Sequence, residues 1–312
     1  MSMLKYLFQF LIFPGFLFSA TVGLFAGWID RKVTGRVQWR KGPPWYQNFL
    51  DVIKLLFYKE TLIPENVSKA IFLGMPLLSL ASVTLVSTIV FVISGRPNAG
   101  FLGDLIVVIY LSMIPAISLM LGGFASENPL ASLGASREMK LMLSYELPFI
   151  IAVIVPVIKC GYAIKVGDII THQSVYGHVI GSASGVISFI AMLLCVQAKL
   201  GFAPFDIPEA ETELMAGPYI EYSGKALGIF KLARAILLFA LPVLMIILYF
   251  GGIGFDAEGF IKSVIQYFAI LAAFIVIKNT NPRVRIDQAV GFFWGPVTVL
   301  AIISVVLAFL KL

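Results

Sequence analysis

The chain has 312 residues, of which 59% are hydrophobic and only 13% charged, and its formal net charge is +6. With a mean hydropathy of +0.95, this composition excludes an ordinary soluble domain and favours a membrane protein with many spans. The lysines and arginines flank apolar runs instead of forming one patch, so the charge reflects membrane topology and argues against a nucleic-acid partner.

Eight segments approach the roughly 20 apolar residues that a transmembrane helix needs. They cover about 4–28, 70–94, 103–125, 141–160, 179–200, 225–250, 260–278 and 289–311. Arg31 and Lys32 follow the first segment, which therefore predicts a transmembrane helix and not a signal peptide. Glu146 and Pro148 open the fourth and make it the weakest. The predicted fold is an all-α integral membrane protein, a single membrane domain over residues 1–312.

The basic residues orient these spans. Fifteen of them lie in or beside the loops after spans one, three, five and seven, against six on the other side. Because cytoplasmic loops carry an excess of Lys and Arg, the loops at about 29–69, 126–140, 201–224 and 279–288 are predicted to be cytoplasmic, and both termini outside a plasma membrane. Thirteen of the 17 acids fall on the same side, although acids contribute little to orientation. This predicts a charged surface for docking or proton handling.

The first cytoplasmic loop contains a predicted interfacial helix. Pro43 and Pro44 suit a helix start, and the apolar residues from Trp45 to Leu56 recur with helical periodicity. Such a helix lies along the membrane surface with its aromatic residues at headgroup level. An anchor alone would not need the basic residues before it, which we predict to dock a soluble partner. They are Arg31, Lys32, Arg36, Arg40 and Lys41.

The segment 201–224 holds five of the 17 acids. They are Asp206, Glu209, Glu211, Glu213 and Glu221. A solvated acidic loop is the simpler interpretation, but seven large apolar or aromatic residues share the segment and favour a partly buried carboxylate cluster. Crowded carboxylates cannot all ionise cheaply, so at least one is expected to have a raised pKa.

The cysteines and histidines suggest no cofactor. Cys160 and Cys195 lie in or beside apolar runs, without ligand spacing for an iron–sulfur cluster or zinc. His172 and His178 fall in the longest outer loop and are interpreted as solvated side chains. We therefore expect no metal and no cofactor in this chain.

At several positions the sequence resembles the membrane subunit of respiratory complex I that joins its two arms, known as subunit 1 or, in bacteria, as the H subunit. The motif Asp30–Pro43, DRKVTGRVQWRKGP, resembles the first loop of that family. Ser144–Glu146 resembles the Ser-Tyr-Glu of a family helix, and Ala203–Tyr222 its acidic loop. Arg285–Gln288 resembles its Arg-Tyr-Asp-Gln. The four motifs occur in order across nearly the whole chain.

One departure narrows the resemblance. After Gly42 the chain continues Pro43-Pro44-Trp45, which is similar to the corresponding subunits of energy-converting membrane-bound [NiFe] hydrogenases and of the related sulfane reductase. The resemblance implies a non-catalytic subunit that anchors a soluble arm and links its ferredoxin-dependent electron transfer to proton or sodium translocation. Expected partners are a hydrogenase-like large subunit carrying the NiFe centre, an iron–sulfur small subunit and antiporter-like membrane subunits. The same role in a sulfane reductase, or a quinone-site subunit of a complex I-like enzyme, are alternatives; a stand-alone carrier is a third class, disfavoured because no inverted repeat is visible.

The coupling role is assigned to titratable residues of the acidic segment and of the fourth and sixth spans. The set is Glu146, Asp206, Glu209, Glu211, Glu213, Glu221, Lys231 and Arg234. Lys231 and Arg234 fit either a relay or a structural ion pair with the acids, and Glu127, Glu138 and Asp104 are weaker candidates. Glu213 is predicted to lie closest to Lys231 and Arg234, so Glu213→Gln is expected to abolish or sharply reduce ion pumping while leaving the complex assembled.

Overall fold

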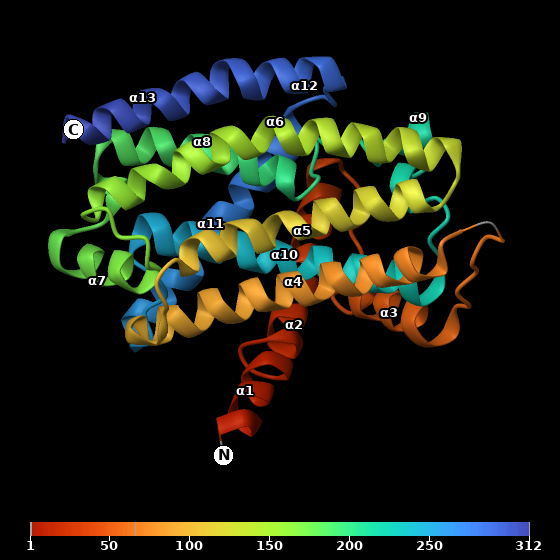
Figure 1. The fold of residues 1–312 in the computed structure, drawn as a ribbon, viewed down its shortest axis with the longest axis horizontal. Helices are drawn as coiled ribbons and strands as arrows, with labels where there is room; N and C mark the ends of the chain where they lie inside the picture. Colours follow the sequence, from red (N-terminus) through yellow and green to blue (C-terminus); the bar gives the residue numbers. More distant parts are fainter. Residues whose placement is uncertain (1, 66, 312) are drawn as a thin grey trace.

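The computed structural model describes residues 2–65 and 67–311, which contain helices and no strand. Long helices run side by side along the molecule, while α2 and α11 cross them at a tilt (Figure 1). The long helices are α2 (Phe16–Val37), α4 (Lys69–Gly95), α5 (Asp104–Ala125), α6 (Pro129–Lys159), α8 (Ala183–Lys199), α10 (Gly224–Phe250), α11 (Ala257–Thr280), and α12 (Ile286–Phe292) continuing through a π-helical turn at Phe293–Val297 into α13 (Thr298–Phe309). The predicted all-α membrane fold is confirmed.

Seven of the described helical stretches are long and apolar enough to cross a membrane, and α8 is a shorter apolar helix. The first crossing combines α1 (Ser2–Leu11) with α2, and the two are separated by a break around Pro14. Proline lacks the backbone N–H that a continuous helix would use, which explains the break. The chain is therefore a multi-pass membrane protein.

Helix α10 is the centre of the bundle. Twenty of its 27 residues are buried, against five of the 24 residues of α11. It packs against α2 and α4 on two sides. A Cβ at Gly23 of α2 would approach the carbonyl oxygen of Ala235 in α10 to 2.0 Å, so glycine is what lets these two backbones touch. This contact fixes α10, and with it Arg234, against α2.

Two helices extend further than predicted on the cation-rich side. Residues 129–140, predicted as loop, form the first turns of α6, which starts where the side chain of Asn128 accepts a hydrogen bond from the Leu130 N–H at 2.9 Å. Glu146 consequently lies within α6 and not at its start. Helix α2 likewise continues to Val37, past the predicted end of the span at residue 28. The polar side chains of these extra turns lower their hydropathy, so a search for apolar segments alone does not predict these turns.

Shorter helices complete the two ends of the bundle. The interfacial segment forms α3 (Gln47–Ile53) and a π-helical turn at Lys54–Tyr58; this helix begins later than the predicted proline start because Pro44–Gln47 form a turn first. Helix α9 (Glu211–Leu214) lies at one end and α7 (Val166–Tyr176) at the other (Figure 1). His172, predicted in a loop, therefore lies on a helix.

Candidate functional site: ion pairs at the charged end

Four segments meet at the end of the bundle that carries α9, which we call the charged end. They are the C-terminal turns of α2, the segment 38–65, the acidic segment 201–224 and residues 281–285 before α12. Ion pairs join this end together: Lys278 to Asp30 at 2.7 Å, Arg234 to Glu209 at 2.6 Å and Arg283 to Asp206 at 2.7 Å. Even the nearest partners in sequence, Arg234 and Glu209, are 25 residues apart, so only the tertiary fold brings them together.

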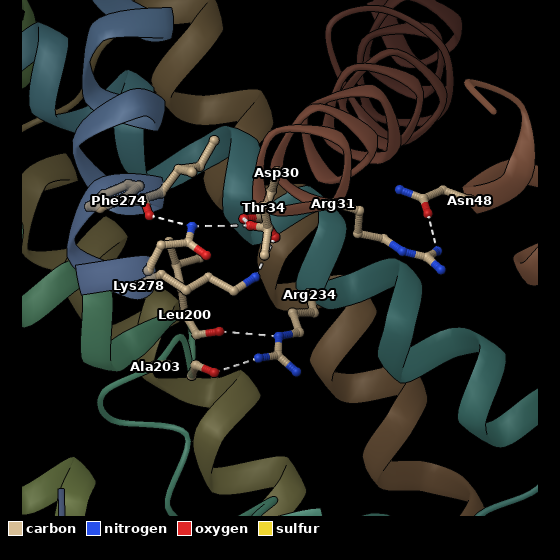
Figure 2. A network of polar contacts seen from close by, with 12 residues as sticks. Asp30, Arg31, Thr34, Asn48, Leu200, Ala203, Arg234, Phe274 and Lys278 are labelled. Atoms are coloured by element: carbon tan, nitrogen blue, oxygen red, sulfur yellow. Dashed lines mark hydrogen bonds and ion pairs between the residues drawn. The ribbon is translucent and has the colours of Figure 1, made fainter. Parts of the chain in front are cut away.

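Arg234 connects α10 to the acidic segment. Its guanidinium donates hydrogen bonds to the carbonyl oxygens of Leu200 at 3.1 Å and Gly201 at 2.6 Å, and to Oε1 of Glu209 at 2.6 Å. Figure 2 shows the side chain reaching the end of α8 from α10. The last carbonyls of a helix have no partner within the helix and carry its partial negative charge, so a cation there is stabilised. Arg234 thus caps α8 and holds Glu209 at the same place.

A second pair lies within the spans. Lys199 at the end of α8 places Nζ 3.2 and 3.1 Å from the two carboxylate oxygens of Glu146 on α6. The side chains are 1% and 8% exposed, and Nζ also lies 4.3 Å from the ring centroid of Phe149. Two charges removed from water must satisfy each other, because an unpaired buried charge costs several kcal/mol.

The pairing of Lys199 with Glu146 was not predicted from the sequence. Lys199 served there only as one of the basic residues that orient the spans. The available signal was a lysine at the end of one apolar span and a glutamate inside another. Ionisable side chains within spans usually face the bundle interior and pair with each other. Glu146, by contrast, was predicted as a site residue, and the structure supplies its partner.

A cavity of about 60 Å³ joins the two pairs. Lys199, Glu209 and Arg234 line it together with Glu138 and Tyr219. This is room for a few water molecules, which can bridge buried polar groups. Burial raises the pKa of the Tyr219 phenol far above its ordinary value, with the Glu209 charge adding to the rise, so this hydroxyl acts only as a neutral hydrogen-bonding group. Glu138, a weaker candidate in the sequence, is here brought beside the main set.

Asp30, Thr34, Lys278 and Asn279 form a third cluster, between α2 and α11. Lys278 bonds Oδ2 of Asp30 at 2.7 Å (Figure 2). The Asn279 amide donates to Thr34 Oγ1 at 3.2 Å. Asp30 is buried, and Lys278 lies 5.0 Å from the ring centroid of Phe202 in the acidic segment. Asp30 belongs to the Asp-Arg-Lys motif, yet no role was predicted for it from the sequence.

Glu213 lies at the outer edge of the charged end, and its environment differs from the predicted one. Its exposed carboxylate accepts a hydrogen bond from Arg137 of α6 at 2.7 Å. That hydrogen bond and the Arg137 charge lower the pKa of Glu213, the opposite of the rise expected for the residue chosen from the cluster. The acid beside Arg234 is Glu209, so the predicted proximity of Glu213 to this arginine is wrong. The cause is that α6 begins as early as Pro129 and so brings Arg137 to the acidic segment.

The remaining predicted relay residues occupy separate places. Asp206 pairs with Arg283, and Oε1 of Glu221 accepts a hydrogen bond from the Asn128 side-chain amide at 2.5 Å. Lys231 is exposed and lines a cavity of about 270 Å³ between α2, α3 and α10, together with Asp30 and Asp51. The side chain of Glu211 lies outside the described part of the chain.

The five predicted docking residues divide into two groups. Arg31 donates to Asn48 at 2.6 Å and pairs with Asp51 at 3.2 Å, and Lys32 reaches the carbonyl of Gly42 at 3.5 Å, so both tie α2 to the segment that follows it. Arg36, Arg40 and Lys41 are exposed at the tip of α2. Trp39 lies among them and is 98% exposed; it was not singled out in the sequence.

Comparisons with known proteins agree with this architecture. A family model described as NADH dehydrogenase matches residues 9–309. The H subunit of NADH-quinone oxidoreductase from Bacillus cytotoxicus is 32% identical over 299 residues, covering 92% of this chain and 87% of the relative. The equivalent subunit from Brevibacillus brevis is 30% identical over 312 residues, covering 96% and 91%. A chain in the solved structure of the membrane-bound sulfane sulfur reductase, an archaeal respiratory membrane complex, superposes with a TM-score of 0.85 at 28% identity, covering 97% of this chain and 99% of that one. The chain therefore belongs to the NADH dehydrogenase family that includes these H subunits, and it is a membrane subunit of a complex I-like oxidoreductase.

Proposed function

We propose that this chain is the membrane-anchoring and energy-coupling subunit of a ferredoxin-dependent membrane-bound hydrogenase complex, in which it links electron transfer in a soluble arm to proton or sodium translocation. The observation that carries the coupling role is the sequence of polar groups from Glu209 and Arg234, through the cavity of about 60 Å³, to the buried pair of Lys199 and Glu146. A membrane subunit that only anchored a soluble arm would not need charges inside its spans, since they are costly there.

The coupling mechanism follows from electrostatics. A change of charge in the soluble arm alters the relative stability of the protonated and ionised forms of nearby carboxylates. Glu209 would take up or release a proton, and Arg234 would turn between Glu209 and the carbonyls of Leu200 and Gly201. Glu146 and Lys199 would transmit the change within the membrane. Asp206, Glu211, Glu221 and Lys231 complete the proposed relay, while Glu213 would serve the attachment of the acidic segment to α6.

The proposal includes an orientation and a set of partners. The charged end would face the cytoplasm, with both termini outside a plasma membrane, and the whole of residues 1–312 would act as one membrane domain. Arg36, Arg40 and Lys41, supported by Arg31 and Lys32, would bind an iron–sulfur small subunit and a large subunit that carries the NiFe centre. Antiporter-like subunits would adjoin the spans, and this chain would hold no cofactor.

Two alternatives keep the same role with another electron acceptor. A sulfane reductase is favoured by the match to that complex over 99% of the compared chain. A quinone-site subunit is favoured by the names of the relatives from Bacillus and Brevibacillus. In the hydrogenase and the sulfane reductase the acceptor would be bound by other subunits, so the assembly must be purified to distinguish them.

The test is to purify the complex through a tag on this chain and supply reduced ferredoxin. Hydrogen evolution, with nickel in the co-purifying large subunit, is the expected result. Hydrogen sulfide formation from a sulfane without nickel would support the sulfane reductase, and reduction of an added quinone would support the quinone-type enzyme. A chain that purifies alone and transports an ion unaided would contradict all three.

A further inference from the structure

A large open cavity at the charged end lies apart from the proposed relay. It measures about 870 Å³ and lies between the π-helical turn Lys54–Tyr58 with the residues after it and the N-terminal turns of α4 and α10. Its lining residues include Phe57, Tyr58, Lys59, Glu60, Leu73, Leu77, Lys225 and Ile229. The ion-pair clusters that the coupling role uses are made by other residues.

The lining is charged at one end of the cavity and apolar at the other, as an amphiphilic molecule is. Lys59 and Lys225 are the charged donors, and Lys225 is the second residue of α10. Ile229 follows one helical turn further into α10, while Leu73 and Leu77 occupy early turns of α4 and are exposed. Both helices start at the charged end, so the cations mark the membrane surface and the apolar residues lie toward the bilayer interior. Glu60 adds one carboxylate, so the lining favours a singly charged anion.

The chain holds this cavity in a fixed shape. Thr61 Oγ1 accepts a hydrogen bond from the Lys225 N–H at 3.0 Å, and Ser223 Oγ accepts one from the Leu62 N–H at 2.9 Å. Gly224 has a φ of +50°, and a Cβ there would meet the Glu60 carbonyl oxygen at 2.4 Å. The segment 59–62 is thus clamped onto the start of α10, although 161 residues separate Leu62 from Ser223.

The aromatic residues at the rim agree with a position at headgroup level. Phe57 and Tyr58 are 78% and 80% exposed, and aromatic belts mark the two interfaces of a membrane with water. Lysines at that level attract anionic lipid headgroups. A protein partner would have to meet this basic-rimmed apolar groove with an acidic amphipathic segment, whereas a lipid supplies the charge and the chain in one molecule that is always present.

We propose that this cavity binds an anionic phospholipid, with the phosphate held between Lys59 and Lys225 and an acyl or alkyl chain along Leu73, Leu77 and Ile229. The lipid fills the space between α4, α10 and the π-helical turn, and so couples the interfacial helix to the two helices that carry the core. The inference concerns a site of this chain and does not depend on the electron acceptor of the complex.

The experiment uses the intact purified complex in nanodiscs of phosphatidylcholine with a small fraction of phosphatidylglycerol. Native mass spectrometry and lipid extraction report the phosphatidylglycerol that stays bound. Each lysine near a membrane surface contributes about a fivefold gain in affinity for anionic lipid, so Lys59→Gln and Lys225→Gln should each weaken retention about fivefold and the double variant about thirtyfold. Lys140→Gln, which removes an exposed lysine of the same end outside the cavity, should leave retention unchanged.

Three results would overturn the proposal. Equal retention in the double variant and the parent would show that the two lysines hold no lipid. Displacement of the lipid by a millimolar excess of inorganic phosphate would identify a free phosphate site instead. Loss of a membrane subunit in the double variant, with no anionic lipid in the parent, would identify a protein interface. Where the double variant fails to assemble, the two single variants and their fivefold effects decide.

Discussion

Two glutamates of the same end of the molecule occupy opposite environments. Glu146 is buried against Lys199, while Glu213 is exposed and held by Arg137. The sequence places Glu146 in the fourth predicted span and Glu213 in the acidic segment, and it shows the partner of neither. The difference arises from α6: its early turns carry Arg137 to the acidic segment, and its middle turns carry Glu146 into the bundle. Burial decides which of the two can report a distant change of charge, because fields act more strongly away from water.

The buried pair supports a test that separates coupling from structure. Glu146→Gln leaves the Lys199 charge without its partner, so it should destabilise the subunit by about 3–5 kcal/mol and reduce assembly. Replacing both residues, by Glu146→Leu with Lys199→Met, removes both charges and should restore assembly, since an apolar replacement of a whole buried pair is often neutral. We expect this double variant to keep ferredoxin oxidation but lose ion pumping in sealed vesicles. Normal pumping by the double variant would show that the pair is only structural.

For Glu213, unlike the buried pair, we expect that replacement leaves ion pumping intact. Its pKa is lowered from the ordinary 4.5 by the hydrogen bond and charge of Arg137, so it is ionised throughout the neutral range. The contribution of this bond to stability is therefore fully present above the ordinary carboxyl pKa and is lost as the pH falls through the lowered one. Glu213→Gln should keep pumping near the parent level at neutral pH, whereas Glu209→Gln should reduce it sharply. Equal losses in both variants would contradict the distinction between them.

At the scale of elements, hydropathy predicts a helix only where that helix lies in apolar surroundings. The seven spanning helices and the shorter α8 could be predicted, because each contains a long apolar run. The extensions of α2 to Val37 and of α6 back to Pro129 do not follow from hydropathy, because their polar residues resemble those of loops. Pro129 and the Asn128 cap were visible in the sequence as helix-start signals. Combining cap signals with hydropathy would have placed Arg137 on a helix.

The contact between α2 and α10 predicts how small changes affect stability. Gly23→Ala would place a methyl group about 2.0 Å from the carbonyl oxygen of Ala235, so the helices must separate. Overpacking of this kind typically costs about 1–3 kcal/mol, and we expect a lower thermal unfolding temperature. Gly74→Ala is the matched control, because a Cβ at Gly74 in α4 meets nothing within 4 Å. It should leave the unfolding temperature unchanged or slightly higher, since alanine favours helix.

The whole molecule concentrates its charges at one end, and the distribution of Lys, Arg, Asp and Glu along the chain already predicts this. The pairing within that end was not predictable, because partners such as Asp30 and Lys278 are separated by 248 residues. The distribution of charged residues along the sequence indicates which end holds the charges. The packing of α2, α10 and α11 decides which of these charges meet. In the proposed function, the exposed charged groups at this end form the surface that binds the soluble arm.

The tip of α2 belongs to that surface. Arg36, Arg40 and Lys41 are exposed there around Trp39, and tryptophan and arginine are among the residues that most often dominate binding energy at interfaces. Arg36→Ala with Arg40→Ala should release the soluble arm from the membrane fraction at moderate salt, as measured by the distribution of its subunits after centrifugation. Lys311→Ala, near the C-terminus, is the control. A fully bound and active arm in the double variant would contradict docking at this tip.

Whether the complex uses a quinone is a question at the scale of the whole molecule. The cavity of about 270 Å³ between α2, α3 and α10 is bordered by charged side chains, among them Asp30, Arg31 and Arg234, and it falls just below the roughly 300–1,000 Å³ of typical small-molecule sites. The turn beside it is held to α2, because the Trp28 indole N–H donates to the Pro43 carbonyl at 3.1 Å. We therefore expect quinone-site inhibitors to leave ferredoxin-dependent activity unchanged. Ala235→Leu, which adds volume inside the cavity, should likewise preserve that activity in an assembled complex. Inhibition at stoichiometric levels, together with loss of activity in assembled Ala235→Leu, would identify a used quinone site and favour the quinone-type alternative.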